Sequence, residues 1–276
     1  MNYNFKPKLY NAVTIALISA GFIPTTFAEV NDLDVNNPNG TTITNSATGN
    51  AVDLDNGGSF TVINNGTISA SATNNAYGVN ADSSTTITTL SNTKTITGTA
   101  SNSNGYGIGI TSTLTSLTNS GTISGTAAND LGRGFSLHAG GTITNLTNSG
   151  TISGTAGDDN GNGVYVTSSS TLTNLTNSGT ISGTSVDDFG FGVYVSSTST
   201  LTNLTNSGTI SATAGGDNGF GIQVKVASTL TNLTNSGTIS GTAGGDNGFG
   251  IQVDASTLTN LTNSGTISGT STNLGL

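Results

Sequence analysis

Nucleophilic catalysis of the Ser/His/Asp type needs an imidazole base beside the serine, and His138 is the only histidine of the chain. It lies in the segment LGRGFSLHAGG, which takes the place of Gly-Val-Tyr-Val in other copies of an internal repeat. We expect a divergent strand there, with the His138 side chain facing solvent. Because the chain has one histidine and no cysteine, metal sites built from imidazole or thiolate ligands are excluded as well.

Aspartates recur at one point of the repeat and are the remaining groups with catalytic or metal-binding chemistry. Stacking of the repeats would bring their loops into one acidic column. Glycoside hydrolysis needs two carboxyl groups about 5 to 9.5 Å apart in a cleft, and aromatic subsites are scarce in a chain without tryptophan. The residues concerned are Asp130, Asp158, Asp159, Asp187, Asp188, Asp217 and Asp246.

Calcium is a second use for such loops, since oxygen-rich loops of neighbouring repeats could share an ion. The run AGGDNGFGIQV resembles a calcium-binding nonapeptide, but its aspartate comes three residues too early and no nine-residue period follows. The same run lacks the helix and the lysine of a nucleotide site. We therefore interpret the aspartates as solvated turn residues and predict no catalytic, cofactor-binding or metal site.

An internal repeat is the strongest signal in the chain. The phrase Asn-Ser-Gly-Thr-Ile-Ser places its glycine at positions 121, 150, 179, 208, 237 and 265, so successive copies lie 29, 29, 29, 29 and 28 residues apart. Degenerate copies precede these at Gly66 and Lys94, and the pattern extends to Gly40. A unit this short cannot enclose a core alone, but stacked units can bury a continuous one.

Each unit divides into three short strand-like pieces separated by Gly, Asn and Asp. Apolar and polar residues alternate along each piece, which is typical of strands with one buried face. Stacking would align the apolar positions into columns. One column is expected to contain Leu117, Leu146, Leu175, Leu204, Leu233 and Leu261; a second runs through nine isoleucines from Ile43 to Ile267; and a third contains Tyr77, Tyr106, Phe135, Phe191, Phe220 and Phe249, interrupted by Asn162.

An asparagine also precedes the turn in every full copy. Amide side chains about 4.8 Å apart can hydrogen-bond along a stack, because each offers two donors and an acceptor. We interpret this column as structural. Its members are Asn119, Asn148, Asn177, Asn206, Asn235 and Asn263. The predicted fold is all-β, a right-handed parallel β-helix (β-solenoid) with about one rung per 29-residue repeat.

The N-terminus has the pattern of an export signal. Lys6 and Lys8 precede an apolar stretch at residues 12–23, and Thr26 and Ala28 supply a small-residue cleavage site. We expect residues 1–28 to be a signal peptide, residues 29–60 an N-terminal cap with a degenerate first rung, and residues 61–276 solenoid repeats that end without a cap or barrel. No later segment approaches the roughly 18 apolar residues of a membrane span.

Charge excludes two classes of partner. After removal of residues 1–28, the strong bases are Lys94, Arg133 and Lys225, against fourteen carboxylates, which gives a net charge of −11. Nucleic acids and anionic membranes are bound by clustered Lys and Arg, and three scattered bases form no cluster. We therefore expect neither partner.

Units of Asn-Leu-Thr-Asn-Ser-Gly-Thr-Ile-Ser and Gly-Phe-Gly-Ile-x-Val after a signal peptide resemble the passenger region of bacterial autotransporters, over about residues 60–276. Similar units occur in other exported β-helical proteins, including filamentous adhesins. The resemblance implies a right-handed β-helix displayed on the surface of a Gram-negative cell. Autotransporters end in a membrane β-barrel, whereas repeat sequence continues here to Leu276, which leaves open whether the chain is a fragment.

Three functions remain, and a non-catalytic structural or adhesive surface module leads. Its expected partner is a host-cell, matrix or glycan surface, and open solenoid ends would favour self-association. An ice-binding solenoid is the alternative, and a polysaccharide-cleaving β-helix is third. The ice-binding alternative depends on a Thr-x-Thr array formed by Thr113 and Thr115, Thr142 and Thr144, Thr171 and Thr173, Thr200 and Thr202, Thr229 and Thr231, and Thr257 and Thr259.

Overall fold

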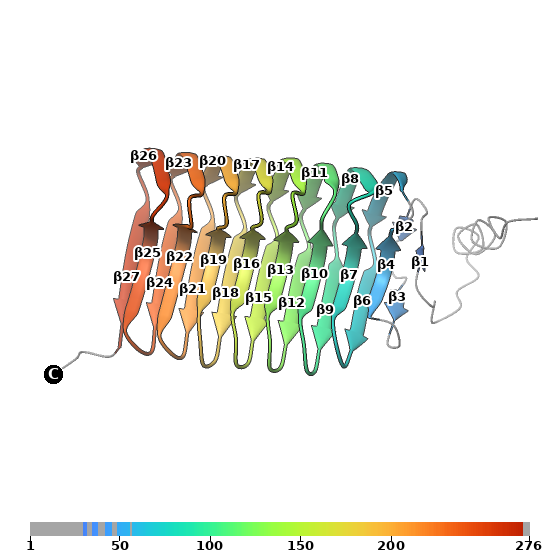
Figure 1. Ribbon diagram of the computed structural model, residues 1–276, viewed down its shortest axis with the longest axis horizontal. Helices are drawn as coiled ribbons and strands as arrows, with labels where there is room; N and C mark the ends of the chain where they lie inside the picture. Colours follow the sequence, from blue (N-terminus) through green and yellow to red (C-terminus); the bar gives the residue numbers. More distant parts are fainter. Residues whose placement is uncertain (1–29, 32–34, 38–41, 46–48, 56, 273–276) are drawn as a thin grey trace, which may run out of the picture.

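The protein is a parallel β-solenoid. The computed structural model describes residues 30–31, 35–37, 42–45, 49–55 and 57–272, and within these ranges it contains 27 strands and no helix. Three strands form one turn of the coil, here called a rung, and the rungs stack into three parallel sheets of nine strands each (Figure 1). The predicted fold class is therefore confirmed, with about 29 residues per turn.

Each sheet takes every third strand of the chain. Sheet A contains β1 (Val30–Asn31), β4 (Asn50–Leu54), β7 (Ala76–Ala81), β10 (Gly105–Ile110), β13 (Gly132–Leu137), β16 (Gly161–Val166), β19 (Gly190–Val195), β22 (Asn218–Lys225) and β25 (Asn247–Asp254). Sheet B contains β2 (Val35–Asn37), β5 (Gly58–Asn64), β8 (Thr85–Asn92), β11 (Thr113–Asn119), β14 (Thr142–Asn148), β17 (Thr171–Asn177), β20 (Thr200–Asn206), β23 (Thr229–Asn235) and β26 (Thr257–Asn263). Sheet C contains β3 (Thr42–Asn45), β6 (Thr67–Ala72), β9 (Thr95–Ala100), β12 (Thr122–Ala127), β15 (Thr151–Ala156), β18 (Thr180–Ser185), β21 (Thr209–Ala214), β24 (Thr238–Ala243) and β27 (Thr266–Ser271).

Two predicted apolar columns are confirmed. Leu117 pairs with Leu146, and this column continues in register through sheet B to Leu261. The nine isoleucines from Ile43 to Ile267 align in the same way through sheet C. In the interior rungs both columns are almost completely buried, so identical side chains stack into one continuous core.

The predicted aromatic column is wrong at Phe135. Phe135 pairs with Ile108 and Val164 inside the core, and Arg133 is the residue in register with Tyr106 and Asn162. Glycines set this register, because a Cβ added at Gly134 would lie 2.8 Å from the Ile152 side chain of sheet C. The alignment of aromatic residues between repeats therefore gave the wrong register for β13, whereas an alignment of glycines gives the correct one.

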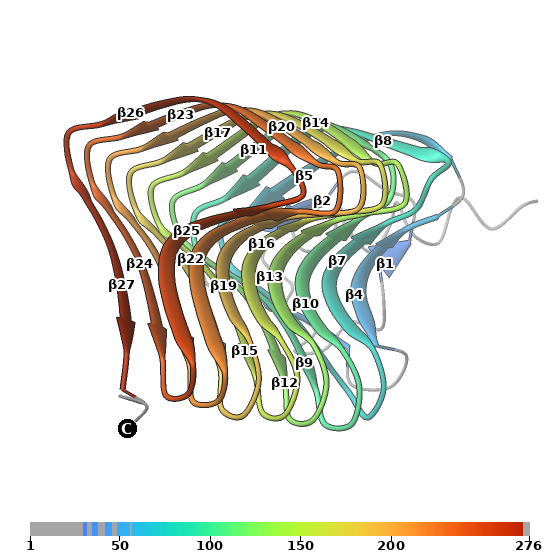
Figure 2. The same cartoon turned by 60° about the vertical axis from the view of Figure 1, so that its left-hand side comes forward.

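The strands of sheet A bend along their length, as Figure 2 shows for β25 and β22. Their first halves lie close to sheet C, and glycine permits this approach. A Cβ added at Gly125 would meet the Arg133 carbonyl oxygen at 1.9 Å. The larger apolar residues of sheet A, such as Ile108, fill the space farther along each strand.

Three turns from sheet A to sheet B, those after β16, β19 and β22, hold two consecutive residues other than glycine in left-handed backbone conformations. Ser168 and Ser169 have φ of 58° and 61°, and Val226 and Ala227 have φ of 58° and 55°. In each of these turns the second residue donates its N–H to a carbonyl of the next rung, as Ser169 does to Ser197 at 2.9 Å. The hydrogen bonding between rungs therefore continues through the turn.

A buried asparagine ladder closes the turn from sheet B to sheet C, as predicted. Asn148 Nδ2 donates to Asn177 Oδ1 at 2.8 Å and to the carbonyls of Gly150 and Thr180. The ladder also extends two rungs beyond the prediction, to Asn92 and Asn64. Each of its interior side chains is fully buried, so its hydrogen bonds replace the lost contact with water.

The predicted signal peptide lies outside the described residues. The stretch predicted as a cap and degenerate first rung contains β1 to β4, which pair in parallel with strands of the following rung. No helix among the described residues is long and apolar enough to cross a membrane.

Candidate functional site

The outer face of sheet B is a regular polar surface. Along β14, Ile143 and Leu146 point into the core, while Thr142, Thr144 and Thr147 are exposed. The same alternation recurs in register on neighbouring strands, so threonines form columns parallel to the solenoid axis. One of these columns is exposed from Thr118 through Thr147, Thr176, Thr205, Thr234 and Thr262.

A second asparagine ladder, which the sequence interpretation missed, crosses this face. Asn174 Nδ2 donates to Asn145 Oδ1 at 2.9 Å, and Asn203 donates to Asn174 at 2.8 Å. Asn232 and Asn260 continue the ladder. These amides donate toward the N-terminal rung, opposite to the buried ladder. The Asn-Leu-Thr phrase recurs in five strands, and this repetition could have predicted the ladder from the sequence.

Sheet A carries stacked aromatic rings on the face turned away from the core. Phe191, Phe220 and Phe249 stack with ring centroids 5.4 and 5.6 Å apart, and Tyr77 stacks on Tyr106 at 4.4 Å. Each ring covers the face of its neighbour, and burial raises the pKa of both Tyr77 and Tyr106. We call this column, together with the residues that interrupt it, the aromatic row.

Polar residues interrupt the aromatic row at two consecutive rungs. Arg133 and Asn162 take the positions that Tyr106 and Phe191 hold on either side. The Arg133 guanidinium carbon lies 3.8 Å from the centroid of the Tyr165 ring, and Arg133 is only 9% exposed. A buried guanidinium against an aromatic face gains cation–π attraction. This is the most distinctive chemical environment in the described part of the chain.

His138 lies beside this interruption, at the end of β13. It was expected to face solvent, but it is half-buried. Burial, followed by the positive charge of Arg133, lowers its pKa, so the imidazole is neutral at neutral pH.

At the turn from sheet C to sheet A, Asp130, Asp159, Asp188 and Asp217 lie close enough for their charges to interact along the expected column. Burial and the charges of Asp159 and Asp217 raise the pKa of Asp188. Burial also raises the pKa of Asp159, and Asp130 adds to that effect. Among the described residues, no group of three His, Cys, Asp or Glu side chains is arranged to hold a metal ion.

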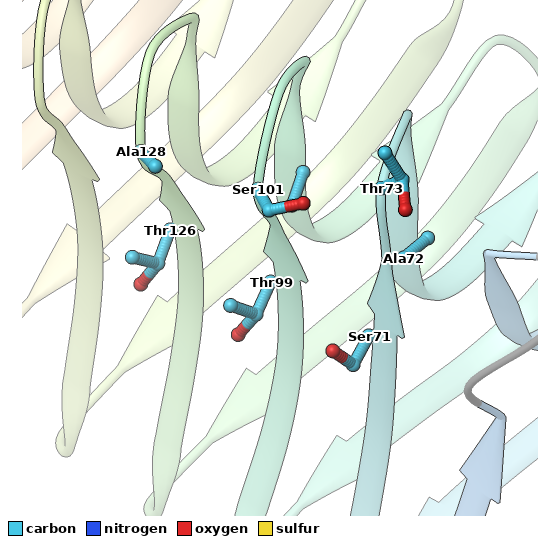
Figure 3. Close-up of a pocket in the computed structure, with 8 residues that line it drawn as sticks. Ser71, Ala72, Thr73, Thr99, Ser101, Thr126 and Ala128 are labelled. Atoms are coloured by element: carbon cyan, nitrogen blue, oxygen red, sulfur yellow. The ribbon is translucent and has the colours of Figure 1, made fainter.

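An open depression of about 410 Å³ lies where β6, β9 and β12 run into their turns. Its lining consists of short hydroxyl and methyl side chains, and Ser71, Thr99 and Thr126 project from successive strands in Figure 3. None of the lining residues is charged or aromatic, so the depression offers few directed contacts to a ligand.

No protein-family model, curated protein or solved structure matches this chain. The parallel β-solenoid is thus the class that the fold defines. Its candidate binding surfaces are the threonine and asparagine face of sheet B and the interrupted aromatic row of sheet A.

Proposed function

We propose that this protein is an exported, non-catalytic surface module, similar to an autotransporter passenger, that holds its cell to a host-cell, matrix or glycan surface. The observation that carries the proposal is the outer face of sheet B, where threonine and asparagine columns repeat in register from rung to rung. Such a face offers the same weak contact many times, and multivalency turns weak contacts into firm attachment. The signal-like N-terminus supports export to a Gram-negative surface.

Surface display and adhesion test this proposal together. The full chain is expressed in a Gram-negative host, and external protease and antibody access are measured on intact cells, followed by attachment to matrix proteins and immobilised glycans. We expect external access and attachment. A triple variant with lysine in place of Thr147, Thr176 and Thr205 should attach more weakly, because it breaks the exposed threonine column. The matched control is a triple variant with lysine in place of the exposed residues Thr126, Thr155 and Thr213 of sheet C. Retention in the cytoplasm, or equal attachment by both triple variants, would contradict the proposal.

Ice binding is a second candidate, favoured by one observation. In β11, β14, β17, β20 and β23 the first two threonines flank a buried residue, and the first threonines, as in Thr171 and Thr200, stack in register along the axis. Threonine is also an ordinary outward residue of β-strands, so the array alone does not require this activity. Inhibition of ice recrystallisation by the purified protein, lost in the sheet B triple variant, would favour ice binding over adhesion.

A further inference from the structure

The interruption of the aromatic row leaves a gap between two tyrosine rings that the Arg133 side chain fills. Tyr106 belongs to β10 and Tyr165 to β16, so one rung, β13, separates their strands. That rung places Ser136 in register with Tyr165, and a serine is too small to fill the space of a ring. The Arg133 guanidinium occupies it instead, with its carbon 5.5 Å from the Tyr106 ring centroid and 3.8 Å from that of Tyr165.

Buried polar atoms without partners surround this gap. Arg133 Nε, Ser136 Oγ and Asn162 Oδ1 are buried and make no hydrogen bond. Ser136 is 0% exposed and Asn162 is 1% exposed. The guanidinium donates a long hydrogen bond from Nη1 to the Tyr106 hydroxyl, at 3.3 Å. Unpartnered buried polar groups are unusual in folded proteins, and a ligand that pairs with them relieves their cost.

We propose that this gap, the Tyr106–Tyr165 slot, binds one ring of a neutral saccharide, which enters when the Arg133 side chain turns outward. The proposal rests on the proposed surface-binding function and adds to the sheet B face a separate site on sheet A with a stated ligand class. With Arg133 turned outward, Ser136 Oγ can donate or accept and Asn162 Oδ1 can accept, and sugar hydroxyls match both groups. The two tyrosine rings offer apolar faces to the carbon side of a sugar ring. An anion would pair only with donors. The negative charges of Asp130 and Asp159 reach Tyr106 and Arg133 and would repel an anion.

Tyrosine fluorescence gives a local readout of the slot. The chain has no tryptophan, and every tyrosine among the described residues, Tyr77, Tyr106, Tyr165 and Tyr194, lies in sheet A. The full chain is titrated with hexaoses of glucose in α-1,4 and β-1,4 linkage, of mannose, of N-acetylglucosamine and of galacturonate. We expect a saturable change in fluorescence, matched by calorimetric binding, with at least one neutral hexaose. Binding of galacturonate alone, or of no hexaose, would overturn the proposal.

Two substitutions fill the slot with residues that other rungs already carry there. Arg133→Phe continues the aromatic row, and Ser136→Tyr copies Tyr165 of the next rung. Each should weaken saccharide binding roughly tenfold or more, because the slot is then permanently occupied. Thr213→Ala, at an exposed position of sheet C outside both candidate surfaces, is the control and should bind as the wild type does. Circular dichroism confirms that each variant is folded.

Tyr165→Leu tests the slot from its other wall. It removes the ring face but adds no bulk, and we expect weaker saccharide binding in a chain that keeps its β-structure. Saccharide affinity equal to the wild type in Tyr165→Leu and in whichever slot-filling variants fold would overturn the site. If attachment of cells then still depends on sheet B, the surface function stands and only the Tyr106–Tyr165 slot is wrong.

Discussion

Ile210 and Thr209 are neighbours in β21 that face opposite sides of sheet C. Ile210 is completely buried between Ile181 and Ile239, whereas Thr209 is partly exposed. Ile210→Asp should lower the free energy of unfolding by several kcal/mol, because it places an unpaired carboxylate in the core. Thr209→Asp should cost far less. Thermal and urea unfolding followed by circular dichroism measure the difference, and equal losses would mean that the faces are assigned wrongly.

Val226 combines two unfavourable features in one turn residue. Its φ is 58°, a conformation that β-branched residues avoid, and its side chain is 52% exposed. Val226→Asn should raise the free energy of unfolding by about 1 kcal/mol, since asparagine adopts this conformation more readily. Val186→Asn is the matched control, because Val186 is 61% exposed and is not among the residues with positive φ. If both variants gained equally, exposure rather than backbone strain would be the cause.

Residue positions could be predicted from the sequence wherever the repeats are nearly identical. The Leu233 and Ile239 positions of one unit predict those of every other, because stacked rungs put equal positions in register. Arg133 could not be placed in this way, since Phe135 offered a false match to the aromatic row. The partial burial of His138 also escaped prediction, because His138 follows the last residue of β13 and alternation along the strand does not fix its side chain.

The two asparagine ladders lie on the same strands but differ in the burial of their side chains. Asn177 is fully buried and its Nδ2 donates to Asn206 Oδ1 and to the carbonyls of Gly179 and Thr209. Asn177→Ala should destabilise the fold by about 2 to 4 kcal/mol, because it leaves buried groups of two adjacent rungs unpaired. Asn174→Ala, in the outer ladder of the same strand, should cost about 0.5 to 1 kcal/mol. Urea unfolding compares them, and a larger loss for Asn174→Ala would refute the structural role assigned to the buried ladder.

At the scale of strands and turns, the sequence predicted three strands per repeat and a hydrogen-bonded asparagine column before the turn, though not its burial. The outer ladder through Asn174 was missed because strict alternation was assumed. In β17 two consecutive residues, Thr173 and Asn174, both face outward between the buried Leu172 and Leu175. The turns at Ser168 and Val226 were missed as well, since they hold left-handed conformations without the usual glycine or asparagine.

The aspartate column couples the stability of the whole solenoid to pH. The folded chain raises the pKa of Asp159 and Asp188, so it binds protons more readily than the unfolded chain does. The resulting stability is complete below about pH 4, the ordinary pKa of aspartate, and is lost as the pH rises through the raised values. In a His138→Gln background, which removes the opposite contribution of the lowered histidine pKa, the melting temperature should therefore fall between about pH 4 and pH 7. Asp188→Asn should flatten this dependence, and an unchanged pH profile would contradict the burial and repulsion assigned to this aspartate.

Salt and calcium separate repulsion from ion binding in the same column. Sodium chloride should raise the melting temperature at pH 7 modestly, because like charges on adjacent rungs lie within the screening length of about 10 Å at 0.1 M. Calcium at equal ionic strength should add nothing, since these aspartates are interpreted as solvated turns. A shift of many degrees at millimolar calcium, abolished by Asp187→Asn with Asp188→Asn, would show instead that the loops hold a metal ion.

The parallel stack of rungs is the claim on which both proposed surfaces depend, and a spin-label ruler tests it most directly. The chain has no cysteine, so pairs of introduced cysteines are the only labelling sites. Thr118→Cys is combined in turn with Thr176→Cys, Thr205→Cys and Thr234→Cys, which are exposed positions two, three and four rungs away. Distances between the label attachment points should rise in equal steps of about 4.8 Å, to roughly 10, 14 and 19 Å. Distances that do not rise in equal steps with rung number would contradict the solenoid.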